Sequence, residues 1–170
     1  MIRNRVFTAV RELCTGCHIC EQVCSLSKTS NINLRRARLR IMPSPKDPSY
    51  FPVICHHCKV PLCQKACPVP EAMYRDEKTG VVVVKETECI GCLACVEACP
   101  FGAIRVGLDQ EILKCDLCGG DPLCVRYCPP RPENSLPHLP WPKQSCLQYV
   151  EPGKIGAQRR LSHALKIGGR

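Results

Sequence analysis

The stretch CIGCLACVEACPFGAI, residues 89–104, contains four cysteines separated by two, two and three residues, with a proline after the last. Three other parts of the chain repeat this pattern, with a middle gap of two, four or five residues. The four groups are Cys14, Cys17, Cys20, Cys24; Cys55, Cys58, Cys63, Cys67; Cys89, Cys92, Cys95, Cys99; and Cys115, Cys118, Cys124, Cys128. A proline follows the last cysteine of three groups (Pro68, Pro100, Pro129), whereas Ser25 follows that of the first group. Only Cys146 lies outside these groups.

The composition indicates that an ordinary hydrophobic core is insufficient for this chain. Of the 170 residues, 17 are cysteine, 16 are proline and only 5% are aromatic. Cofactors or cross-links are therefore expected to supply part of the stability. The N-terminal residues lack the apolar region of a secretory signal, and the longest aliphatic run, Val81–Val84, is too short to cross a bilayer. We therefore expect a soluble, cytoplasmic protein. Because the cytoplasm is reducing, its dense cysteines are expected to bind metal rather than to form disulfides.

The spacing within each group is typical of cysteines that bind a [4Fe–4S] cluster. Three cysteines on a short loop can each bind one iron, and the fourth cysteine of such a run binds a neighbouring cluster. Gly16 and Gly91, each directly before a second cysteine, allow the backbone to approach a cluster closely. Structural zinc usually uses two separated C-x2-C pairs, and disulfides require an exported chain, so both alternatives are less favoured. The sequence therefore predicts four [4Fe–4S] clusters.

The detailed motifs resemble those of a known family. The third group continues as CPFGA (99–103), the second reads CHHCKVPLCQKACP (55–68), and the fourth combines KCDLC (114–118) with DPLCVRYCP (121–129). From about Phe7 to Pro129, the chain resembles the four-cluster ferredoxin-like subunits of molybdenum and tungsten oxidoreductases of the dimethyl-sulfoxide-reductase, formate-dehydrogenase and hydrogenase-associated kinds. Its short length and the absence of an export signal or membrane helix make it most similar to the small subunit of a cytoplasmic oxidoreductase, such as a tungsten-dependent aldehyde oxidoreductase.

The resemblance also implies how the cysteines combine. In this family, the first group pairs with the fourth, and the second pairs with the third. The implied ligands are Cys14, Cys17, Cys20 and Cys128 for cluster 1; Cys24, Cys115, Cys118 and Cys124 for cluster 2; Cys55, Cys58, Cys63 and Cys99 for cluster 3; and Cys67, Cys89, Cys92 and Cys95 for cluster 4.

Short strands and turns are expected between the cysteine groups. Residues 72–85 should form a hairpin that turns at Gly80, residues 103–114 should form a second hairpin that turns at 107–109, and residues 36–42 should form a strand. With one short helix per cysteine group, we expect an α+β fold of two bacterial-ferredoxin-like (βαβ)2 modules. The outer module would comprise residues 1–50 and 105–129, and the inner module, residues 51–104, would be inserted in it.

Residues 130–170 differ in character from the rest. Six prolines between 129 and 142 predict an extended arm, which could pack on its own module or lie on a partner subunit. Trp141 is expected to be buried in either case. The basic stretch 154–170 could form a short helix that docks on an acidic partner, a solvated tail or a membrane-surface contact.

The charge balance does not indicate nucleic-acid binding. The formal net charge of +9 counts cysteines as neutral thiols. Each oxidised cluster with its four thiolates carries about −2, so four clusters would leave a net charge of about +1. No nucleic-acid-binding motif is visible. His57, directly before Cys58, is expected to hydrogen-bond to a cluster or tune its potential rather than to bind iron, and Cys146 is expected to be a small packed residue.

These observations predict an electron-transfer subunit without catalytic activity of its own. The chain contains no phosphate-binding loop, dinucleotide fingerprint or nucleophile constellation. Its clusters would pass single electrons between a large tungsto- or molybdopterin subunit and a flavin subunit, a soluble ferredoxin or another copy of the chain. The alternatives are a free-standing polyferredoxin and a structural zinc-binding interaction module.

Overall fold

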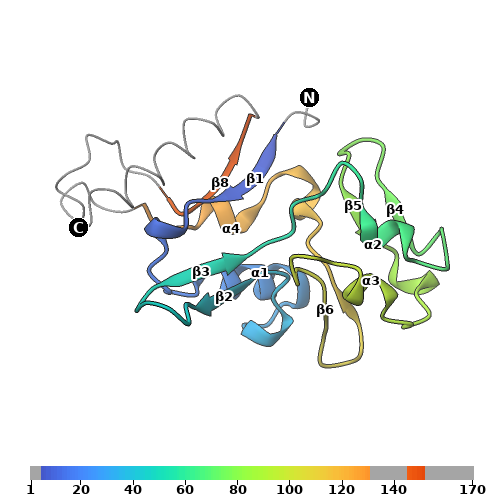
Figure 1. Cartoon of the computed structure of the whole chain (residues 1–170), viewed down its shortest axis with the longest axis horizontal. Coiled ribbons are helices and arrows are strands. Elements are labelled where there is room, and N and C mark those ends of the chain that lie inside the picture. The colour runs from blue at the N-terminus through green and yellow to red at the C-terminus, as the bar shows by residue number, and fades with distance from the viewer. Residues whose placement is uncertain (1–4, 131–144, 152–170) are drawn as a thin grey trace.

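A computed structural model describes residues 5–130 and 145–151. These residues form a small α+β structure with short strands and few helices (Figure 1). The strands are β1 (Val6–Ala9), β2 (Arg40–Pro43), β3 (Tyr50–Val53), β4 (Met73–Arg75), β5 (Val82–Val84), β6 (Arg105–Val106), β7 (Ile112–Leu113) and β8 (Leu147–Val150). The α-helices are α1 (Ile19–Thr29), α2 (Leu62–Lys65), α3 (Ala94–Glu97) and α4 (Leu123–Arg126), and the 3-10 turns are η1 (Arg11–Leu13), η2 (Leu34–Arg36), η3 (Glu86–Glu88) and η4 (Leu117–Gly120).

The strands pair as antiparallel two-stranded sheets. The β4–β5 pair aligns Met73 with Val84 around a turn at Gly80, and the β6–β7 pair closes through a hydrogen bond from the Gly107 N–H to the Glu111 carbonyl. Both predicted hairpins are thereby confirmed. The strand predicted at 36–42 begins only at Arg40, because the Asn33 side chain accepts a hydrogen bond from the Arg35 N–H and starts a 3-10 turn instead.

A strand that the sequence analysis did not predict lies in the expected C-terminal arm. β8 pairs with β1, so that Leu147 lies opposite Ala9, and the Val10 N–H donates to the carbonyl of Cys146. The two strands lie side by side in Figure 1, although about 140 residues separate them in the sequence. Residues 145–151 therefore return to the start of the folded structure. The proline-rich stretch from residue 131 onward, Trp141 and the basic stretch 154–170 lie outside the described residues.

The length of each helix depends on which residue comes directly after the fourth cysteine of its group. α2, α3 and α4 each have four residues and end before the prolines at 68, 100 and 129, because proline lacks the N–H and clashes with the preceding turn. α1 has eleven residues and continues past Cys24, because Ser25 replaces the proline. Ser25 is fully buried; its hydroxyl donates to the carbonyl of Gln22 and accepts from the N–H of Asn33.

Two hydrophobic clusters form the core. The larger contains Phe7, Leu39, Ile41 and Leu147, and the smaller contains Met73, Val82, Ile104 and Ile112. α1 packs against α4 in the first region, and α2 packs against α3 in the second. The two regions are joined, since Val81 belongs to the larger cluster and the 105–113 hairpin contributes to the smaller one. No described helix is long and apolar enough to span a bilayer.

The cysteine loops contain an unusual number of left-handed residues. His18, His57, Leu93, Leu117 and Cys118 all have positive φ, as do the glycines at 16 and 91. Such conformations are unfavourable for residues with a side chain and occur mainly where a functional site requires them. Left-handed residues of this kind can turn successive backbone N–H groups toward one side, which is the geometry of anion-binding sites such as those for iron–sulfur clusters.

We expect Ser25→Pro to shorten α1 and destabilise the protein. Proline at this position removes a hydrogen bond inside the helix and clashes with the preceding turn, at a cost of about 3 kcal/mol or more. Urea unfolding followed by circular dichroism measures the change. Ser25→Ala is the matched control, because it removes only the hydroxyl contacts and should cost about 1 kcal/mol. Equal effects of the two substitutions would contradict the role given to the missing proline.

Gly16 and Gly91 have the same backbone conformation, but we expect alanine to destabilise the protein more at Gly16. Gly16 has φ of +70° and Gly91 has φ of +69°, so alanine at either position should cost about 1–2 kcal/mol. A Cβ on residue 16 would also lie 2.6 Å from the Tyr50 ring, whereas nothing lies within 4 Å of one on residue 91. Gly16→Ala should therefore lower the unfolding midpoint further than Gly91→Ala. Adding Tyr50→Ala should reduce the difference, and a persisting difference would show that the ring is not its cause.

Candidate iron–sulfur sites

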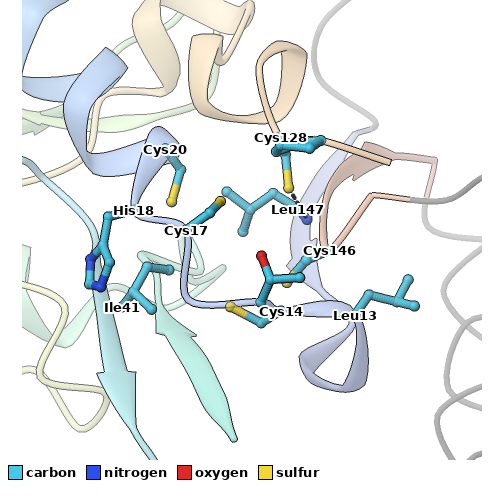
Figure 2. A pocket seen from close by; sticks show the side chains of 11 residues that line it. Leu13, Cys14, Cys17, His18, Cys20, Ile41, Cys128, Cys146 and Leu147 are labelled. Atoms are coloured by element: carbon cyan, nitrogen blue, oxygen red, sulfur yellow. Dashed lines mark hydrogen bonds between the residues drawn. The ribbon is translucent and has the colours of Figure 1, made fainter. Parts of the chain in front are cut away.

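The first site consists of Cys14, Cys17, Cys20 and Cys128, which line one cavity. The first three come from the loop after η1 and the start of α1, and Cys128 follows α4. Figure 2 shows their side chains around the cavity, with Leu147 of β8 beside them. The Leu147 N–H donates to the sulfur of Cys128 over 3.4 Å. β8 thus covers this site and supplies a hydrogen bond to one of its sulfurs.

Cys146 lies in the same cavity. It is buried, as expected of a small packed residue, but its thiol interacts with that of Cys14, and this hydrogen bond is the main cause that raises the pKa of Cys146 above its ordinary value. No cysteine lies near Cys146 in the sequence, and Cys14 is more than 130 residues away. Only the pairing of β8 with β1 brings the two together.

The second site consists of Cys24, Cys115, Cys118 and Cys124. Burial raises the pKa of Cys124, and the nearby thiols of the other three raise it further. Backbone N–H groups point at two of the sulfurs: Arg38 donates to Cys24 over 3.3 Å, and Leu117 donates to Cys115 over 3.4 Å.

Asp116 connects the second site to its surroundings. Its carboxylate accepts hydrogen bonds from the Cys118 N–H (3.0 Å) and the Lys28 ammonium (2.7 Å), and Arg38 lies 3.8 Å away. Burial alone would raise the pKa of Asp116, but the hydrogen bonds from Lys28 and Cys118 bring it below its ordinary value. The carboxylate therefore joins the end of α1 to the loop that presents Cys118.

The third site consists of Cys55, Cys58, Cys63 and Cys99, which line a cavity of about 230 Å³. His57 lines the same cavity, and neither of its buried ring nitrogens has a hydrogen-bond partner among the described residues. Burial lowers the pKa of His57 to about 3, so its ring is neutral and carries one N–H. A buried N–H without a partner is costly, and an acceptor placed in this cavity would remove that cost.

The fourth site consists of Cys67, Cys89, Cys92 and Cys95, which also line one cavity. Burial raises the pKa of Cys95 to about 11, and the neighbouring thiols of Cys89 and Cys67 contribute. Cys92 is exposed, as is Cys17 of the first site, whereas the second and third sites have no exposed cysteine. Exposed cysteines thus occur at the first and fourth sites.

The four sets of cysteines have the properties of sites that bind a metal-containing group through sulfur. Burial raises the pKa of Cys20 and of Cys115 to about 12, so these thiols stay protonated unless a metal displaces the proton. Backbone N–H groups already point at several sulfurs, as they do in iron–sulfur proteins. None of the groups of His, Cys, Asp and Glu among the described residues is arranged to hold a single metal ion. That each set binds a cluster stays a prediction.

Comparison with known proteins identifies the kind of domain. The family described as a 4Fe-4S dicluster domain matches residues 47–134, and one described as a 4Fe-4S binding domain matches residues 11–27. The matched segments together include all four cysteine groups.

Several curated proteins are similar to this chain. The polyferredoxin-like subunit of an aliphatic sulfonate oxidoreductase from Pyrococcus furiosus is 38% identical over 134 residues, which cover 75% of this chain and 73% of that protein. Formate hydrogenlyase subunit 2 of Escherichia coli is 33% identical over 164 residues, with coverage of 74% and 78%. Some relatives are longer, since the chain matches only 20% of one from Escherichia coli and 64% of one from Methanocaldococcus jannaschii.

Among solved structures, the active-site complex BamBC of benzoyl coenzyme A reductase with 1,5-dienoyl-CoA has a TM-score of 0.46 and 22% identity, covering 86% of this chain and 75% of that chain. The family match spans more than half of the chain, and the sulfonate oxidoreductase subunit is matched over most of its length. The chain therefore belongs to the 4Fe–4S dicluster domain family.

Proposed function

We propose that this protein is an electron-transfer subunit of an oxidoreductase complex and carries four [4Fe–4S] clusters, one at each cysteine site. The observation that supports this most directly is that sixteen cysteines gather as four quartets, each with three cysteines from one group and a fourth from another. This is the ligand pattern of paired clusters. When bound, a [4Fe–4S] cluster supplies one-electron redox chemistry without making or breaking bonds in a substrate.

The sites form a series in the order first, second, third, fourth. α1 contains a cysteine of the first site and one of the second, and α4 contains a cysteine of the second site and is followed by one of the first. α2 and α3 each contain a cysteine of the third or fourth site and are followed by a cysteine of the other. The second and third sites adjoin where Cys115 and Cys55 interact electrostatically. We propose that electrons follow this series, and that the outer pair of sites (first and second) and the inner pair (third and fourth) define two ferredoxin-like modules, one inserted in the other.

The two ends of the series are the sites that contain an exposed cysteine. Cys17 is exposed at the first site and Cys92 at the fourth. Ile90 is 67% exposed directly beside the fourth site, and Leu93 is also exposed there. Exposed apolar side chains next to an accessible redox site favour contact with another protein. We propose that the fourth site faces one redox partner and the first site faces the other.

The residues of the chain position and tune the clusters. The left-handed loops and the N–H groups of Arg38, Leu117 and Leu147 hold the cysteine sulfurs and stabilise negative charge on them. His57 is proposed to donate its remaining N–H to a sulfur at the third site. Burial of Cys24 and Cys124 limits the access of water to the second site, which lowers the cost of rearranging solvent when charge moves.

The relatives suggest what the partners are. The Pyrococcus relative is named as a subunit of an aliphatic sulfonate oxidoreductase, and the Escherichia relative as a subunit of formate hydrogenlyase. We propose a large tungsto- or molybdopterin subunit as one partner of this chain. The other would be a flavin subunit, a soluble ferredoxin or a second copy.

The number of clusters can be tested by metal analysis. Protein purified without oxygen should contain about 16 iron and 16 acid-labile sulfide per chain. Cys95→Ala should lower the iron content by about four atoms, because it removes a buried ligand of the fourth site. Cys146→Ala should leave the iron content unchanged, because this residue belongs to none of the four quartets. Colourless protein with about four zinc per chain would contradict the iron–sulfur proposal.

The partner can be tested by affinity purification of the full chain without oxygen from its native cells. A large pterin-containing protein should co-purify at a fixed ratio. Ile90→Asp should weaken the retention of a partner that docks at the fourth site, while the iron content stays the same. Ile32→Asp, at an equally exposed isoleucine (64%), is the control and should have no effect. Purification of the chain alone, with full clusters, would favour a free-standing polyferredoxin.

A further inference from the structure

Lys114 is the one buried basic residue in the described part of the chain, with 3% of its surface exposed. It follows β7 and directly precedes Cys115 of the second site. Its side chain extends into the cavity of the third site, which it lines together with Cys55, Cys63 and Cys99. The residue therefore belongs to two sites at once: its backbone to the second and its ammonium group to the third.

The ammonium group of Lys114 has neutral partners only. It donates to the carbonyl of Val82, lies 3.4 Å from the carbonyl of Cys115 and lies 3.7 Å from the sulfur of Cys55. Among the described residues, no carboxylate lies within 4 Å of it; the carboxylate of neighbouring Asp116 pairs with Lys28 and Arg38 instead. A buried charge is costly unless an opposite charge compensates it.

The surroundings indicate where the compensating charge belongs. The thiol of Cys55 acts electrostatically on that of Cys115, and Lys114 acts electrostatically on Cys63 and on His57. The sulfur of Cys55 at the third site is thus the group in contact with the ammonium that can become negative, and Cys115 of the second site approaches the ammonium through its carbonyl. A cluster bound at either site carries about two negative charges with its thiolates, and one more when reduced.

We propose that Lys114 is a shared counter-charge that sets the reduction potentials of the clusters at the second and third sites. This inference rests on the proposed function, because it requires clusters at both sites. A fixed positive charge stabilises the more negative, reduced form, so Lys114 raises both potentials. Its attraction for an electron at either site also makes it less unfavourable for both sites to be reduced at once.

Lys114 acts on the clusters through charge, so it is a positioning residue rather than a ligand. A purely structural alternative exists, because its hydrogen bonds to the carbonyls of Val82 and Cys115 also tie β5 to the start of the fourth cysteine group. Reduction potentials separate the two roles. Loss of a structural link would lower stability or iron content, whereas loss of a counter-charge lowers potentials in protein that still holds all its iron.

The experiment compares the purified full chain with Lys114→Met, Lys114→Gln and Lys46→Met. Methionine has a similar length but no charge, and glutamine retains hydrogen-bond donors without the charge. Lys46 is exposed and lines none of the cysteine cavities, so it controls for the loss of one positive charge. Iron and sulfide are measured first, and the potentials are then obtained by a redox titration followed by electron paramagnetic resonance.

We expect both Lys114 variants to retain about 16 iron and two of the four potentials to fall. The equilibrium constant for one-electron reduction should decrease about tenfold at each of these two clusters, which corresponds to about 59 mV. The other two potentials should move less, and Lys46→Met should shift none of them. If methionine disturbs packing and lowers the iron content, the glutamine variant decides the outcome.

Three results would overturn the inference. Full iron with unchanged potentials would show that Lys114 exerts no electrostatic control. An equal shift in Lys46→Met would show that only the net charge matters. Loss of iron in both Lys114 variants would assign the residue a structural role. A wild-type protein that lacks about 16 iron would instead contradict the proposed function, and the two failures are therefore distinguishable.

Discussion

The fold depends on one geometric constraint: the third and fourth cysteines of every group are four residues apart, and a helical turn lies between them. Cys20 and Cys24 both lie in α1, one turn apart, and Cys124 of α4 is followed by Cys128 in the same way. Each helix therefore contributes to two neighbouring sites. Helices that share sites in this way must pack in pairs, as α1 does with α4 and α2 with α3. The short strands connect these pairs and add only small hydrophobic clusters.

Much of this arrangement could be predicted from local patterns. The two hairpins were recognisable because a turn glycine or a Gly-Leu-Asp turn separates apolar strand residues. Three of the helices end shortly before the prolines of the cysteine groups. β8 was missed, because Leu147–Val150 is a four-residue strand after a proline-rich stretch and its partner lies at the other end of the chain. Long-range pairing of such short strands has no local signal. The start of β2 was misplaced because the capping contact of Asn33 overrides the alternating pattern.

At the cysteine sites, too, some features could be predicted from neighbouring residues, whereas others depend on contacts made only in the folded chain. The spacing pointed to sixteen cysteines, but how they combine came from a resemblance to a family. In the structure, the first, third and fourth sets each line one cavity, and their role as cluster ligands stays a prediction. Lys114 and Asp116 stand in the KCDLC motif, yet nothing local distinguishes a buried lysine from an exposed one. The signal that could have suggested Lys114 is its position directly before a cysteine of the fourth group in a chain of overall positive charge. Cys146 could not be placed, because its neighbour depends on the β1–β8 pairing.

That pairing has a consequence for how the protein is made. A growing polypeptide folds from its N-terminal side as it leaves the ribosome. The third and fourth quartets are complete once Cys99 has been synthesised, whereas the first and second wait for the segment that ends at Cys128. β8 comes later still, and it carries the Leu147 N–H that reaches the sulfur of Cys128. Biosynthesis therefore imposes a sequence of assembly in which the middle of the polypeptide can mature first, while the cysteines nearest the N-terminus are translated early but enclosed last.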